Sequence, residues 1–170
     1  MNGSRTDRRR FLALGAGATL VTASGLTVPA QAAGLPPTPT MRGGANNYRA
    51  GAAIMERIGG GGFTMEGRVR RAGDGAPLAG RRIQMWAHTT EGHERDWESH
   101  GATLTNEDGL FVMDMPQIVP AFGQAHGHLA YDADEDGAFG GGGFETVFLR
   151  PLMSSPNDKT LFVDFVLTPA

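Results

Sequence analysis

The sequence predicts an all-β fold: a single antiparallel β-sandwich of about seven strands with an N-terminal arm. From Phe63 onward, short runs of alternating apolar and polar residues are separated by turn residues, as in sandwich strands. Glycine is abundant, at 26 residues, and aromatic residues make up only 8%, which favours turns and short strands over long helices. The 170 residues, 40% of them hydrophobic, suffice for one modest core and therefore for one domain.

Residues 1–32 indicate an export signal. Arg8, Arg9 and Arg10 precede Phe11 and Leu12, and this run resembles the twin-arginine signal. An apolar stretch ends in Pro29-Ala30-Gln31-Ala32, which is similar to a processing site. The resemblance implies a protein that is exported through the twin-arginine pathway and is periplasmic or secreted. The alternative is a membrane anchor, but the stretch is short and rich in glycine and threonine, so we expect no stable membrane span after processing.

Residues 33–62 are rich first in proline and then in glycine, which is typical of a linker or arm. Within this segment, 50–58 has the apolar spacing of one short helix, although so short a helix is marginal alone. The arm could pack across its own domain or exchange with a neighbour, which would give a homo-oligomer.

The sandwich is expected over residues 63–170. The strand Gly80–His88 carries Ile83, Met85 and Ala87 on one face and Gln84, Trp86 and His88 on the other. Trp86 is expected to be a core residue between the sheets. A charged loop follows at 91–99, and an acidic, glycine-rich loop is expected at 132–143. The remaining strands are expected at 64–70, 102–105, 110–115, 125–131, 146–149 and 160–167.

Composition excludes several functions. The chain has no cysteine, so disulfides, thiolate metal sites and cysteine nucleophiles are ruled out, and a metal would need histidine, carboxylate or tyrosine ligands. The net charge is −3, and without residues 1–32 it becomes −6, from 11 basic and 17 acidic residues. Such a mildly acidic protein has no electrostatic footprint for nucleic acid.

A family resemblance begins in the segment Gly67–Met115. It contains Asp74-Gly75-Ala76-Pro77-Leu78-Ala79-Gly80, a strand that reaches Trp86, and Thr105-Asn106-Glu107-Asp108-Gly109. Downstream come His126-Gly127-His128-Leu129 and the closing strand 162–167. Together these features resemble the intradiol ring-cleavage dioxygenases, over about two-thirds of the chain. The resemblance implies a β-sandwich that binds non-haem iron through two tyrosines and two histidines and acts on small aromatic diols.

The chain departs from that family at both tyrosine positions. Its only tyrosines, Tyr48 and Tyr131, fall at other places. By register with the family, Glu94 takes the place of the first tyrosine, beside His93. The second should fall between 115 and 123, where Val119, Ala121 and Phe122 cannot ligate, and the family's arginine corresponds to Gly123. We therefore expect an altered ligand set.

The strongest candidate for chemistry is the pair His126 and His128. Residues two apart on a strand point to the same face, so both imidazoles can reach one cation at about 2 Å. The alternative is a pair of surface histidines on an edge strand. Together with Glu94, and with His93 or His88 as further ligands, the pair would suit ferrous iron, copper, zinc or manganese.

Two function classes remain open from the sequence. One is a metal enzyme, oxygen-using or hydrolytic, and the other is a binding module that has kept the sandwich and lost the chemistry. Trp97 and Phe122 are candidate substrate contacts, and no residue is assigned a catalytic role. The acidic run Asp132–Gly137 matches half of a calcium loop, but position twelve is Gly143, so a solvated loop is expected rather than a calcium site.

Overall fold

The computed structural model describes residues 34–170, so the twin-arginine motif and its processing site lie outside the described part. Within that part, seven strands form where the sequence alternates. In β1, Phe63–Arg71, the residues at odd positions from Phe63 to Val69 are buried and those between them are partly exposed. The other strands are β2 Arg82–Ala87, β3 His100–Leu104, β4 Leu110–Met115, β5 Gly127–Tyr131, β6 Val147–Leu149 and β7 Thr160–Leu167.

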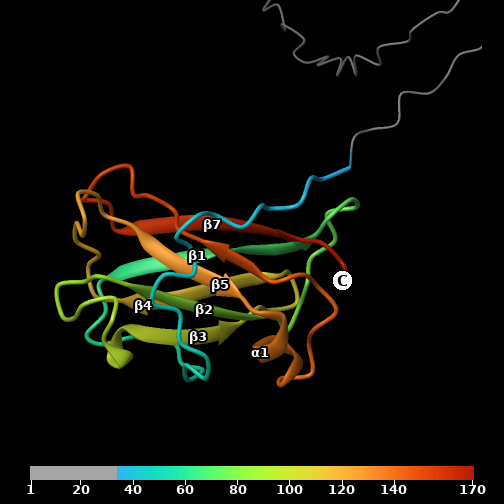
Figure 1. Ribbon diagram of the computed structural model, residues 1–170, viewed down its shortest axis with the longest axis horizontal. Helices are drawn as coiled ribbons and strands as arrows, with labels where there is room; N and C mark the ends of the chain where they lie inside the picture. The colour runs from blue at the N-terminus through green and yellow to red at the C-terminus, as the bar shows by residue number, and fades with distance from the viewer. Residues whose placement is uncertain (1–33) are drawn as a thin grey trace, which may run out of the picture. The chain divides into compact units, whose positions relative to one another are not determined.

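The strands form two sheets, ordered β4-β1-β7 and β3-β2-β5-β6, which are the two layers of the sandwich (Figure 1). This confirms the predicted all-β sandwich. One pair differs from a purely antiparallel arrangement, because β7 runs parallel to β1. β6 and β7 lie in different sheets, and the intervening residues 150–159 deliver Thr160 beside Thr64, at the beginning of β1.

Apolar side chains from both layers fill the space between the sheets. Met65, Ile83, Met85 and Leu129 are all fully buried there. Gly67 is required for close packing, because a Cβ at this position would lie 1.9 Å from the Val163 carbonyl oxygen and against the Phe111 ring. Trp86 is also fully buried, but it does not belong to this core. It lies on the opposite face of β2, which corrects the expectation of an inter-sheet tryptophan.

The arm, residues 34–62, forms no helix over 50–58. Between residues 41 and 55 it crosses the outer face of the β3-β2-β5-β6 sheet in turns and extended segments, and its two ends bond to β7 and β4 of the other sheet. It bonds to the backbone of β6 where the Met41 amide donates to the Phe148 carbonyl. It then reaches the opposite edge, where Ala53 and Met55 pair with Ala102 of β3. These bonds to the sheet edges satisfy backbone groups that a helix would have paired internally. The arm lies on its own chain, so exchange into a homo-oligomer stays a prediction.

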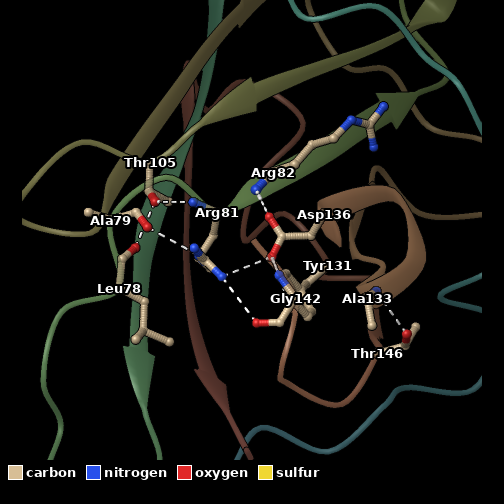
Figure 2. Close-up of polar contacts among 10 residues, drawn as sticks. All are labelled: Leu78, Ala79, Arg81, Arg82, Thr105, Tyr131, Ala133, Asp136, Gly142 and Thr146. Carbon is tan, nitrogen blue, oxygen red and sulfur yellow. Dashed lines mark hydrogen bonds and ion pairs between the residues drawn. The ribbon is translucent and has the colours of Figure 1, made fainter. Parts of the chain in front are cut away.

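The segment 132–143 is not a simple solvated loop. It contains the short helix α1, Ala133–Gly137, and the Asp136 carboxylate is fully buried. Its oxygens accept hydrogen bonds from the Arg82 amide, the Tyr131 hydroxyl and the Gly142 amide, and it pairs with Arg81 (Figure 2). This carboxylate of the half calcium motif therefore has protein partners. No helix in the described residues is long and apolar enough to cross a membrane.

Candidate metal centre

His126 and His128 lie side by side on the outer face of the β3-β2-β5-β6 sheet. His128 belongs to β5. His126 is the residue just before the beginning of β5, and it pairs with Leu152. The two-residue spacing brings their ring centroids to 5.1 Å, as the alternation of a strand requires. They are 4% and 1% exposed, so the alternative of two surface histidines is wrong.

Glu94 completes a group of three. It lies in the loop between β2 and β3, where the His93 amide donates to the Asp96 carboxylate and the Asp96 amide donates to the His93 carbonyl. This turn points Glu94 inward, and the residue is only 3% exposed. Its Oε2 lies 3.4 Å from Nε2 of His126 and 3.5 Å from Nε2 of His128. The three potential ligand atoms all lie within 4.8 Å of one another.

Backbone carbonyls determine which nitrogen of each imidazole carries a hydrogen and donates it. Nδ1 of His126 lies 2.9 Å from the Gln124 carbonyl, and Nδ1 of His128 lies 3.1 Å from the Gly44 carbonyl. Since a carbonyl only accepts, each Nδ1 donates, and each ring presents Nε2 toward Glu94. Burial lowers the pKa of His128, which favours its neutral form.

The centre contains buried polar atoms that have no partner. Nε2 of His128 and Oε2 of Glu94 make no hydrogen bond, although both are buried. Two acceptors that face each other without a donor are costly, and a shared cation would satisfy both. Two imidazoles and one carboxylate with open positions form a donor set for ferrous iron and other divalent transition metals. The residues therefore fit a non-haem metal.

The arm supports this centre through residues that the sequence did not reveal. The side-chain amide of Asn47 donates to Oε1 of Glu94 at 2.8 Å, which leaves Oε2 for the histidines. The Asn46 carbonyl accepts from the Trp86 indole at 3.0 Å. The Trp86 ring stacks on His128 at 5.1 Å and on His100 at 5.5 Å, because the register places all three directly across neighbouring strands.

Other residues proposed from the sequence lie outside the group. His93 packs against His88 and Phe122, and its Nδ1 accepts from the Arg95 amide. The expectation that His93 or His88 would join the ligand atoms therefore finds no support in this geometry. Phe122 is 78% exposed, and Trp97 is 50% exposed and packs against His100.

Both tyrosines are engaged elsewhere. The Tyr48 hydroxyl donates to Asp132 at 2.7 Å, and the Tyr131 hydroxyl donates to Asp136 at 2.9 Å. Burial first, and then these hydrogen bonds to carboxylates, raise the pKa of each phenol above its ordinary value. Each phenol therefore stays protonated.

No protein-family model and no curated protein matches this chain. Solved structures do. The hydroxyquinol 1,2-dioxygenase of Pseudomonas putida DLL-E4 matches with a TM-score of 0.58 and 14% identity, over 80% of this chain and 68% of that one. The catechol 1,2-dioxygenase of Acinetobacter radioresistens matches with a TM-score of 0.55 and 14% identity, over 82% and 64%.

A third match spans almost the whole of a smaller protein. It is the dioxygenase domain of a dioxygenase carbohydrate-binding protein fusion from Streptomyces sp. SirexAA-E, with a TM-score of 0.53 and 18% identity, over 79% of this chain and 99% of that one. At these identities the likeness concerns the fold alone. Residues 34–170 therefore have an intradiol dioxygenase-like fold, and its outer sheet face carries a candidate metal centre of Glu94, His126 and His128.

Proposed function

We propose that this chain is an exported non-haem metalloprotein in which Glu94, His126 and His128 bind ferrous iron, and that it acts with dioxygen on small aromatic diols. The observation that carries the proposal is the convergence of two imidazoles and a carboxylate, with Oε2 of Glu94 and Nε2 of His128 buried and unpartnered. Iron is placed first among divalent metals because the similar folds are named dioxygenases. Export and the diol substrate rest on the sequence resemblances.

Each residue of the centre has a separable role. When bound, the metal would supply open coordination positions for a diol and for dioxygen chemistry. His126 and His128 would bind the metal through Nε2. The Gln124 and Gly44 carbonyls orient the two rings by accepting hydrogen bonds from Nδ1. Glu94 contributes the negative charge that offsets a divalent cation.

The arm covers the centre and contacts two of its three residues. Asn47 ties one oxygen of Glu94, so the carboxylate would offer the metal one oxygen rather than two. Gly44 is buried over His128 and lies directly against Phe148 of β6, since a Cβ there would meet the Phe148 carbonyl at 2.7 Å. A low local dielectric strengthens the pull of Glu94 on a bound cation.

Metal content tests the proposal directly. Protein exported through its own signal and then purified is expected to hold about one equivalent of iron, read by elemental analysis. Glu94→Gln keeps the shape of the side chain and removes the charge, and it is expected to lose most of the metal. Glu98→Gln, an exposed change in the same loop, is the matched control and keeps it.

The loaded protein should then consume dioxygen when supplied with catechol or hydroxyquinol. A metal content below about a tenth of an equivalent, with no uptake of Fe(II), Cu(II), Zn(II) or Mn(II) on titration, would contradict the metal centre. Metal uptake without dioxygen consumption would contradict the enzymatic part and leave a metal-binding module.

A further inference from the structure

A groove opens between the arm and the segment that follows β6. Its volume is about 530 Å³, within the range of roughly 300–1,000 Å³ that small-molecule sites occupy. The turn of the arm forms one wall and the stretch after Leu149 forms the other. The residues that line it are Met41, Arg42, Gly43, Asn46, Arg150 and Leu152.

The groove gathers positive charge in an acidic protein. Of the ten arginines among residues 34–170, six lie within 4.0 Å of a carboxylate, and Arg42 and Arg150 are not among those six. The whole chain carries a net charge of −3. Two guanidinium groups without a described carboxylate partner, on the walls of one concave site, attract a negative group.

Gly43 leaves room beside the guanidinium group of Arg150. Its φ is +76°, a backbone conformation that glycine adopts without strain, and a Cβ there would lie 3.5 Å from Nη1 of Arg150. A larger side chain at position 43 would occupy the space beside the Arg150 donors. The turn of the arm therefore leaves those donors accessible from the groove.

The groove borders the candidate metal centre, because three of its lining residues are neighbours of residues that contact or form the centre. Gly43 precedes Gly44, whose carbonyl binds His128, and Asn46 precedes Asn47, whose side chain binds Glu94. Leu152 pairs with His126 across the sheet edge.

The apolar part of the groove indicates which kind of group is attached to the anionic group of the ligand. Met41 and Leu152 are 42% and 46% exposed, so both present apolar surface at the rim. Methionine sulfur and arginine planes both pack well on aromatic rings. An aromatic ring that bears one carboxylate matches this combination of two guanidinium groups and two apolar side chains.

We propose that the groove formed by Arg42, Arg150, Met41 and Leu152 binds an aromatic carboxylate, with its carboxylate on the guanidinium groups and its ring on the apolar rim. Binding in the groove does not depend on the metal.

The test compares benzoate with benzamide, which has a similar shape and no charge. Both are titrated into metal-free and metal-loaded protein, and the amide signals of Gly43 and Asn46 are followed by nuclear magnetic resonance. Benzoate is expected to shift these signals and benzamide is not. Arg150→Gln is expected to weaken benzoate binding by about tenfold or more, since a hydrogen bond to a charged group is lost.

Arg68→Gln is the matched control, because it removes the same charge from the other sheet and should change benzoate affinity by about twofold at most. If Arg150→Gln fails to fold, the exposed Arg42→Gln replaces it with the same expected direction. Equal binding of benzoate and benzamide, or equal losses in Arg150→Gln and Arg68→Gln, overturns the proposal. Benzoate binding to a protein that takes up no metal would support the groove while contradicting the proposed function.

Discussion

The two faces of the β3-β2-β5-β6 sheet are both buried, but by different means. The inner face carries Ile83, Met85 and Leu129, which are covered by apolar side chains of the second sheet. The outer face carries Trp86 and His128, which are covered by the backbone of the arm. All six residues of β2 and all five of β5 are consequently buried.

The difference teaches how the molecule separates stability from chemistry. Apolar burial on the inner face contributes free energy in proportion to the area removed from water. On the outer face, hydrogen bonds to carbonyls contribute little net free energy each, but leaving a buried group unpaired costs about 1–3 kcal/mol. The inner face therefore stabilises the fold, and the outer face sets the positions of polar groups.

The largest expected effect is on the inner face. Leu129→Ala removes a fully buried side chain, and the free energy of unfolding should fall by about 2–5 kcal/mol in denaturant titrations. The metal affinity of the folded fraction should change by less than about tenfold, because no ligand atom is removed. A variant that is as stable as the parent, or that has lost its metal while still folded, would break the comparison.

An intermediate effect is expected from the arm. Asn47→Gly and Asn47→Ala both remove the amide that holds Glu94, so metal affinity should fall by about 10–100-fold in both. Asn47 has a φ of +61°, so only the alanine variant also places a Cβ in the left-handed region, which costs about 1–2 kcal/mol.

Metal titration and thermal unfolding separate these two contributions. Equal metal affinity in the parent and in both variants would mean that Asn47 does not position Glu94. Equal stability of the two variants would mean that the left-handed conformation is not maintained.

The smallest effect concerns pH. Burial holds the pKa of folded His128 below its unfolded value of about 6.5, so below that pH the unfolded chain binds a proton that the folded protein does not. The stability of the metal-free protein should therefore fall as pH decreases below about 6.5, by at most roughly 1.4 kcal/mol per unit for this group. His128→Gln should flatten the profile measured by denaturant titration at successive pH values, and an unchanged slope would contradict this role of burial.

Much of the fold was accessible from the sequence because strand alternation is a local property. The pattern of Ile83 and Met85 against Gln84 and Trp86 predicted two different faces of β2, and the His126–His128 spacing predicted a shared direction. Glu94 was suggested only by the family register, since a single glutamate in a charged loop carries no signal of its own.

The path of the arm could not be predicted in the same way. Gly44 and Asn46 act through backbone carbonyls, which every residue has, so their contacts leave no trace in residue type. The buried Asp136 was hidden for another reason, because its acidic neighbours suggested a solvated loop. His93 was proposed because it is adjacent to Glu94, but the tight turn that points Glu94 inward places His93 against His88 and Phe122 instead.

The arm also pairs with both borders of its sheet, through Met41 at Phe148 and through Ala53 and Met55 at Ala102. Open sheet borders are templates on which further chains can add strand by strand. A protein whose arm has been cut away by a protease would present both borders at once. We expect such a trimmed form to assemble into fibrils that bind thioflavin, whereas the intact protein would stay dispersed.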